Sequence, residues 1–316
     1  GPVPEVRKAL GKMPYPHIYP DPESRQLREA LASWTGVPMK NLVAGAGADE
    51  LIDLIMRLVL DPDDAILNCP PTFSMYAFDA AIQDARVVNV PRRDDFSIDL
   101  DAIENAALEH KPKLLFLTSP NNHDGSLTPP EHIRRLLKLP LLVVLDEAYI
   151  DFASCRTSML EEAAERQNLI VLRTFSKWAG LAGMRVGYGS FPDVLLPHLW
   201  KIKQPYNVSV AASTAAEVSL QNLEALESNR MKLIEERSRL TAALEEVSFL
   251  DPYPSEANFV LSRVLDRDAR QLKMDLAQRG ILIRYFQKPG LQDKIRISVG
   301  KPEHTDRLIS TLRKME

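Results

Sequence analysis

The chain has 316 residues, of which 45% are hydrophobic, so it can bury a large core and form more than one domain. Its net charge of −4 argues against a nucleic-acid partner, and no apolar run reaches the roughly 18 residues of a membrane span. The two cysteines, Cys69 and Cys155, match no zinc or secreted-disulfide pattern, which favours a reducing compartment.

Strand-like and helix-like segments divide the chain into three expected regions. Residues 1–37 are expected to form a proline-rich N-terminal arm and part of the small domain, with a short helix over 24–34. Residues 38–205 alternate between strand and helix patterns, which predicts a large domain with a mostly parallel sheet covered on both faces. Residues 206–316 begin with a long inter-domain helix and continue as a small α+β domain, with strands near 258–261 and 295–298.

The first candidate site segment is the glycine-rich turn Val43-Ala-Gly-Ala-Gly-Ala-Asp49, which opens an amphipathic helix. Backbone N–H groups and the dipole at such a helix start suit a phosphate. The turn lacks the third glycine of the dinucleotide fingerprint, so a nucleotide cofactor of that kind is not indicated.

Two later segments are apolar strands that end in polar residues. Asn122 follows one of them, and Asp146 and Tyr149 end the other. Ligands of open α/β sheets bind at this carboxyl edge, and an aspartate there can keep a cofactor's pyridine nitrogen protonated. Taken alone, the first segment would be an ordinary turn and the second a solvated carboxylate.

The segment 174–185 is the most informative, because it places Lys177 after a strand and Arg185 eight residues later. A lysine nucleophile needs a desolvated amine or cationic neighbours to react near neutral pH. Ser176 and Arg185 would donate to a nearby phosphate. A surface lysine in a turn is the simpler interpretation of an isolated Ser-Lys pair, but this pair accompanies the other segments.

Two C-terminal segments, 280–284 and 294–300, alternate like half-buried strands, and each carries an arginine. The planar guanidinium groups of Arg284 and Arg296 could each bind a carboxylate or a phosphate with two hydrogen bonds. An exposed strand charge is the alternative for both.

Together these segments resemble the class I and II aminotransferases over nearly the whole chain. Within that family the similarity is greatest to the histidinol-phosphate aminotransferases of plants and algae. The resemblance rests on Leu117-Thr-Ser-Pro-Asn-Asn, Asp124-Gly-Ser126, Arg173-Thr-Phe-Ser-Lys177, Lys203-Gln-Pro-Tyr-Asn-Val-Ser209 and Gly300-Lys-Pro-Glu-His-Thr-Asp306. It implies an α/β chain of fold type I, with a seven-stranded, mostly parallel sheet in the large domain and a smaller α+β domain.

The resemblance also implies the reaction. Pyridoxal 5′-phosphate would serve as cofactor, and an amino group would pass between L-histidinol phosphate and 2-oxoglutarate, yielding glutamate, in histidine biosynthesis. The protein would act as a homodimer with shared active sites. It would work in the plastid stroma of a plant or alga after removal of a transit peptide, or in a bacterial cytoplasm.

Residue roles follow from the same resemblance. Lys177 would bind the cofactor covalently and move the substrate's proton, Asp146 would pair with the pyridine nitrogen, and Tyr149 would hydrogen-bond the ring oxygen. The other implied cofactor contacts are Asn122 on the ring oxygen, Phe73 on the ring face, and Ala48, Asp49, Ser176, Arg185 and a neighbouring subunit's Tyr19 on the phosphate. The implied substrate contacts are Arg296, Arg284, Tyr206 and Asn122.

Two features depart from the family pattern. His123 stands where the family usually has proline, so we expect either a trans bond with a shifted loop or a strained cis bond before it. A metal or catalytic role for His123 is less expected than a variant turn. The chain also begins just after a family segment that helps close the substrate pocket.

Three alternatives remain at this stage. An aromatic-amino-acid aminotransferase or a threonine-phosphate-type decarboxylase would use the same cofactor residues. A non-catalytic, aminotransferase-like domain is the third, and the presence of Lys177, Asp146 and Arg185 argues against it.

Overall fold

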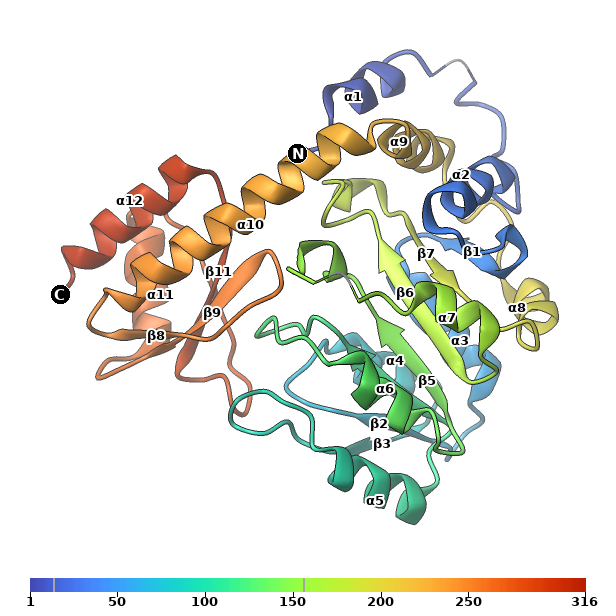
Figure 1. Ribbon diagram of the computed structural model, residues 1–316, viewed down its shortest axis with the longest axis horizontal. Helices are drawn as coiled ribbons and strands as arrows, with labels where there is room; N and C mark the ends of the chain where they lie inside the picture. Colours follow the sequence, from blue (N-terminus) through green and yellow to red (C-terminus); the bar gives the residue numbers. More distant parts are fainter. Residues whose placement is uncertain (14, 156) are drawn as a thin grey trace.

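The computed structural model describes residues 1–13, 15–155 and 157–316, which form two sheets connected by the long helix α10 (Leu223–Glu245) (Figure 1). The larger sheet has the strand order β1-β7-β6-β5-β4-β2-β3. Its strands are β1 (Leu42–Gly45), β2 (Ala65–Asn68), β3 (Arg86–Asn89), β4 (Leu114–Thr118), β5 (Leu142–Asp146), β6 (Leu169–Thr174) and β7 (Gly187–Ser190). Strand β7 runs antiparallel to its two neighbours and the other pairs are parallel, which confirms the expected sheet.

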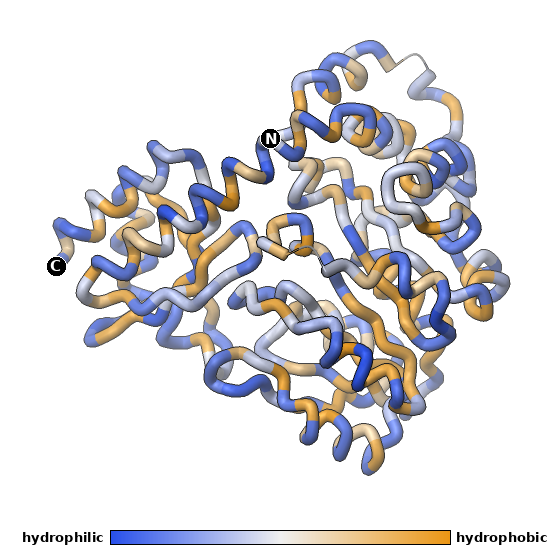
Figure 2. Tube along the Cα trace, viewed as in Figure 1, coloured by the Kyte–Doolittle hydropathy of each residue, from blue (hydrophilic) through white to orange (hydrophobic). Residues whose placement is uncertain are grey.

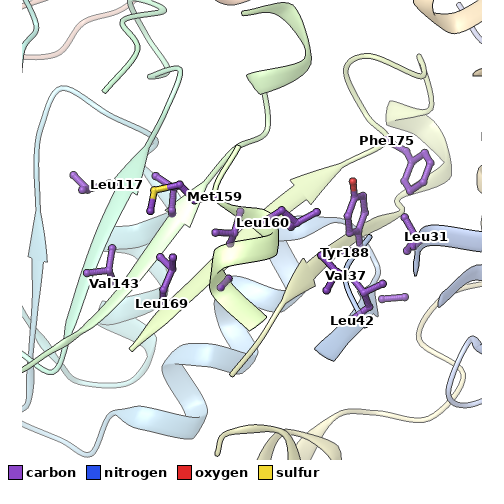
Figure 3. Packing of buried hydrophobic residues seen from close by; sticks show 14 of the residues in the cluster. Leu31, Val37, Leu42, Leu117, Val143, Met159, Leu160, Leu169, Phe175 and Tyr188 are labelled. Carbon is purple, nitrogen blue, oxygen red and sulfur yellow. The ribbon is translucent and has the colours of Figure 1, made fainter. Parts of the chain in front are cut away.

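Side-chain alternation along the central strands explains why helices cover both faces. In β4, Leu115 and Leu117 join one buried cluster, whereas Leu114 and Phe116 join the cluster on the opposite face. Figure 2 shows these strands as apolar stretches of the chain, and Figure 3 shows part of the first cluster, where Leu117 and Val143 lie near Met159. The core therefore fixes the central strands on both sides.

Helices on the first face include α2, α5, α6, α7 and α9, and helices on the second face are α3, α4 and α8. Their bounds are α2 (Arg25–Thr35), α3 (Ala48–Val59), α4 (Met75–Ile82), α5 (Leu100–His110), α6 (Pro130–Leu136), α7 (Leu160–Glu165), α8 (Leu196–Ile202) and α9 (Val210–Leu220). Helix α1 (Pro4–Leu10) packs against α9, and short 3-10 helices cover Met39–Asn41, Ile150–Phe152 and Ala182–Met184. The helix expected over 24–34 is α2, one residue later at each end.

The smaller sheet is antiparallel, in the order β10-β11-β9-β8. Its strands are β8 (Leu250–Pro252), β9 (Phe259–Val264), β10 (Arg284–Tyr285) and β11 (Lys294–Ser298), and it packs with α10, α11 (Ala269–Gln278) and α12 (Pro302–Arg313). The strand expected over 280–284 is wrong in extent, because pairing with β11 begins only at Arg284 and Leu282 is 85% exposed.

The larger sheet falls within residues 38–205 and the smaller one within 206–316, while the expected domain division itself stays a prediction. Among the described residues, no helix is both long and apolar enough to cross a membrane.

Candidate active site

Three parallel strands end at one cavity of about 310 Å³. Thr118, Asp146 and Thr174 are the last residues of β4, β5 and β6, and all three line it. Because carboxyl ends of parallel strands share one edge of a sheet, segments far apart in the sequence meet there. The cavity also brings together most of the residues expected from the sequence: Ala48, Asp49, Phe73, Asn122, Asp146, Tyr149, Ser176, Lys177, Arg185 and Arg296.

Asp146 is a buried carboxylate held by two donors. Its Oδ1 accepts from the backbone N–H of Ala148 at 2.9 Å, and its Oδ2 accepts from the Tyr76 hydroxyl at 2.8 Å. Burial raises the pKa of Asp146 to about 6, although both hydrogen bonds oppose the shift. A cationic ring nitrogen in the cavity would supply the counter-charge that this carboxylate lacks.

Lys177 lies in the turn that follows β6. Its Nζ is 5.4 Å from the ring centroid of Tyr149, whose ring packs edge-on against Phe259. Thr174 orders the same turn, because its hydroxyl donates to Ser176 Oγ at 2.9 Å and accepts from the Ser176 N–H at 3.0 Å. The strand end therefore positions both Ser176 and Lys177 at the cavity.

The start of α3 and Arg185 lie together at one end of the cavity. Gly47 adopts φ +83°, and a Cβ there would lie 2.5 Å from Nη2 of Arg185. That same Nη2 pairs with Asp49 Oδ2 at 2.5 Å. A Cβ on Gly187 would lie 2.6 Å from the backbone nitrogen of Ala48. Glycines thus let the arginine and a second strand approach the N–H groups that open the helix.

Arg296 reaches the cavity from β11. One of its Nη atoms donates to Asn122 Oδ1, and its guanidinium lies 4.5 Å from the ring centroid of Phe259. Its Nε is buried without a hydrogen-bond partner, and no described carboxylate forms an ion pair with it. Burial, together with the nearby charge of Arg284, lowers the pKa of Arg296. The site therefore favours an anionic ligand.

Three expected residues do not line the cavity within this single chain: Arg284, Tyr19 and Tyr206. Arg284 is exposed on β10, opposite Arg296 in the strand register, and its guanidinium lies 5.5 Å from the Phe286 ring centroid. Tyr19 is 79% exposed and stacks on Tyr206 at 4.8 Å between ring centroids.

The bond before His123 is trans, because the cis bonds of the described residues precede Pro71 and Pro120. The imidazole is buried, with its centroid 4.2 Å from that of Phe286, and neither nitrogen forms a hydrogen bond of good geometry. Burial and the charge of Arg296 lower the pKa of His123 to about 3, so the ring is neutral. No group of three metal-ligating side chains occurs among the described residues.

Four lining residues were missed by sequence reasoning: Thr118, Ala148, Thr174 and Ala182. The two threonines had a usable signal, because each is the last residue of an apolar run. Ala148 and Ala182 carry no polar group that a pattern could identify. On a different side, Lys177 also lines a second cavity of about 880 Å³, together with Gly1, Trp178 and residues of α10.

A lysine and a buried carboxylate that face one cavity at the carboxyl edge of this sheet define the class of protein, the fold-type I pyridoxal-phosphate enzymes. The sequence model "Aminotransferase class I and II" matches residues 1–312, and the chain belongs to that family.

Among curated proteins, the chain is similar to the chloroplastic histidinol-phosphate aminotransferase of Nicotiana tabacum, with 54% identity over 99% of this chain and 76% of that protein. It is 48% identical to the histidinol-phosphate aminotransferase of Roseiflexus castenholzii, over 100% of this chain and 86% of that protein. Among solved structures, it is similar to histidinol-phosphate aminotransferase from Sinorhizobium meliloti in complex with pyridoxal-5′-phosphate. The TM-score is 0.93 at 30% identity, covering 100% of this chain and 89% of that one.

Proposed function

We propose that this chain is a pyridoxal-phosphate-dependent aminotransferase that passes an amino group between L-histidinol phosphate and 2-oxoglutarate, in histidine biosynthesis. The observation that carries the proposal is that Lys177, the buried carboxylate of Asp146 and the unpaired guanidinium of Arg296 share one cavity. The identity to the plant and bacterial relatives supports the choice of substrate.

The cavity fits pyridoxal phosphate at each of its ends. Asp146 would pair with the ring nitrogen and Phe73 would cover a ring face. Asn122 and Tyr149 would hydrogen-bond the ring oxygen. The phosphate would accept from the N–H groups of Ala48 and Asp49, from Ser176 and from Arg185, which would exchange part of its contact with Asp49 for the phosphate.

When bound, the cofactor supplies an electron sink for the bond to the substrate's Cα. The chain's own residues supply the proton handling. Lys177 would bind the cofactor and, once displaced by the substrate amine, would take the proton from the substrate's Cα and deliver it to the cofactor's C4′. The ring centroid of Tyr149 lies 5.4 Å from the Lys177 amine, so this ring would limit where the amine can move.

Arg296 would select the substrates, because it can grip either a carboxylate or a phosphate. Glutamate and 2-oxoglutarate have two carboxylates, whereas histidinol phosphate has none, so its phosphate would take the carboxylate's place. Arg284, opposite Arg296 on β10, would approach as the second phosphate contact.

Turnover assays separate this function from its two nearest alternatives. We expect glutamate to form from L-histidinol phosphate and 2-oxoglutarate much faster than from phenylalanine and 2-oxoglutarate. Faster turnover with phenylalanine would mark an aromatic-amino-acid aminotransferase. Release of carbon dioxide from threonine phosphate would mark a decarboxylase.

We also propose a homodimer in which Tyr19, and with it Tyr206, completes the neighbouring subunit's site. The exposed stack of Tyr19 on Tyr206 supports this, since exposed aromatic pairs suit an interface. A mixture of Tyr19→Ala and Lys177→Ala chains tests it. Mixed dimers would regain one intact site and part of the activity, whereas a mixture no more active than its parts would refute the shared site.

The compartment we propose is the plastid stroma in a plant or alga, or the cytoplasm in a bacterium. The chloroplastic relative from Nicotiana tabacum supports the first. Fractionation of the source cells, followed with an antibody to the chain, tests it.

A further inference from the structure

Asp146 is hydrogen-bonded to a group of buried polar side chains, of which Thr118 also lines the cavity. The hydroxyl of Tyr76, a residue with no exposed surface, is 2.8 Å from Asp146 Oδ2 and 2.7 Å from Thr118 Oγ1. A carboxylate can only accept hydrogen bonds, so the Tyr76 hydroxyl donates its single proton to Asp146. Thr118 must then donate to Tyr76, which fixes the direction of both bonds.

A second group of buried polar side chains lies beside the first, at the loop that carries Asn122. Thr72 Oγ1 lies 3.3 Å from Thr118 Oγ1 and donates to Asn121 Oδ1 at 2.8 Å. Asn121 is fully buried and also donates to the backbone oxygen of Pro71 at 3.1 Å. Because Thr118 donates its single proton to Tyr76 and Thr72 donates its own to Asn121, no proton is left between the two threonine oxygens, and the two groups pack side by side without a hydrogen bond between them.

We propose that Tyr76, supported by Thr118, is a positioning residue for the cofactor, which holds the Asp146 carboxylate anionic and oriented toward the ring nitrogen. The inference rests on the assignment of Asp146 in the proposed function. Hydrogen bonds to a carboxylate favour its charged form, and burial opposes that form. Of the charged groups nearby, Lys177 also favours the anion and Asp49 disfavours it.

The hydroxyl can be tested apart from the ring. The Tyr76 ring stacks on Phe116 at 4.8 Å and meets Phe73 edge-on at 5.5 Å, and a phenylalanine would keep both contacts. Tyr188 provides a matched control, because its hydroxyl is equally buried but has no hydrogen-bond partner among the described residues.

The measurement is the dissociation constant of pyridoxal phosphate from the cofactor-free chain, together with the absorbance spectrum of the bound cofactor. We expect Tyr76→Phe to raise the constant by about tenfold or more, as the loss of a hydrogen bond to a charged group predicts, and to alter the spectrum. Tyr188→Phe should stay within about twofold of wild type. Equal effects in the two variants would overturn the proposal, as would an unchanged constant and spectrum in Tyr76→Phe.

A double-mutant cycle sharpens the test. In an Asp146→Asn background, Tyr76→Phe should change the constant by less than about twofold, and an undiminished effect there would refute action through Asp146. If Tyr76→Phe does not fold, Thr118→Val should weaken binding and Thr118→Ser should retain it. Equal affinity in those two would also refute the proposal. A wild-type chain that bound no pyridoxal phosphate would instead refute the proposed function.

Discussion

The two ends of the cavity differ in how much of their geometry the chain supplies by itself. At the end that would face the cofactor's ring nitrogen, called the nitrogen end, the side chains of Asp146, Tyr76 and Thr118 are buried and hydrogen-bonded to one another. At the other end, called the anion end and formed by Asp49, Arg185 and Arg296, the contacts are partial. Arg185 is paired with Asp49 in half-exposed geometry, and Arg296 has no acid partner among the described residues.

This difference separates two kinds of group. The Asp146 carboxylate would keep one partner throughout the reaction, whereas Arg296 would exchange one substrate anion for another. A buried carboxylate with two hydrogen-bond donors, such as Asp146, would hold one ring position throughout turnover. A guanidinium without an acid partner, such as that of Arg296, can bind a carboxylate in one half-reaction and a phosphate in the other. Substitutions at the nitrogen end should therefore change the affinity for the cofactor, and substitution of Arg296 should change KM for the substrates.

Loss of Lys177, which lies between the two ends, should have the largest effect. Lys177→Ala removes both the covalent attachment and the proton carrier, so we expect turnover to fall by about 10⁴-fold or more and the lysine-dependent absorbance to vanish. The exposed Lys201→Ala, on α8, is the control and should behave as wild type. Retained turnover in the Lys177 variant would overturn the assignment.

Arg296→Ala should weaken substrate binding and leave the cofactor in place. Breaking a charged pair with a substrate anion in a partly buried site costs about 3–5 kcal/mol, which corresponds to a rise in KM of roughly 10²- to 5 × 10³-fold. The absorbance of the bound cofactor should be unchanged. Arg263→Ala, an exposed arginine on β9 that pairs with Asp293, is the control. A lost cofactor spectrum in Arg296→Ala would contradict the separation of the two ends.

Acid should act first on the nitrogen end. Because burial raises the pKa of Asp146 to about 6 in the cofactor-free protein, the carboxylate is anionic above that pH and neutral below it. Affinity for pyridoxal phosphate should therefore fall by up to about tenfold per pH unit below 6. Measuring the dissociation constant of pyridoxal phosphate from pH 5 to 8 tests this. In the Asp146→Asn variant, the loss of affinity below pH 6 that is due to Asp146 should be absent.

The same shift has the opposite sign for stability. The folded carboxyl binds its proton more tightly than an unfolded one with the ordinary pKa of 3.8. The contribution of Asp146 to the free energy of unfolding of the cofactor-free chain should therefore decrease as pH rises from about 4 to about 6.

Arg284→Ala should have the smallest effect, because this arginine is exposed. A screened surface charge contributes about 1 kcal/mol or less, so KM for histidinol phosphate should rise by no more than about fivefold. An effect as large as that of Arg296→Ala would show that the cavity closes over both arginines when substrate binds.

Much of the fold could be predicted from the sequence, since its signals are local. Continuous apolar runs predicted β4 and β5, and glycine with an amphipathic pattern predicted the turn into α3. The strand expected over 280–284 failed because pattern alone does not reveal where a neighbouring strand stops pairing. Likewise, the role proposed for Tyr76 depends on a contact across 70 positions, which no local pattern carries.

At the site, the structure brings together residues whose segments lie far apart in the sequence, and their roles stay predictions. Lys177, Asp146 and Arg296 line a common cavity, as expected from their segments. Tyr19, Tyr206 and Arg284 do not line it within a single chain, so their roles stay predictions about a second subunit or a bound substrate.

The most direct test of the central claim is the absorbance spectrum of the purified chain with pyridoxal phosphate, recorded before and after addition of L-histidinol phosphate. We expect the absorbance band of the lysine-bound cofactor to disappear with this substrate and to return when 2-oxoglutarate is added. A band that forms with pyridoxal phosphate but ignores L-histidinol phosphate would contradict the assignment of substrate.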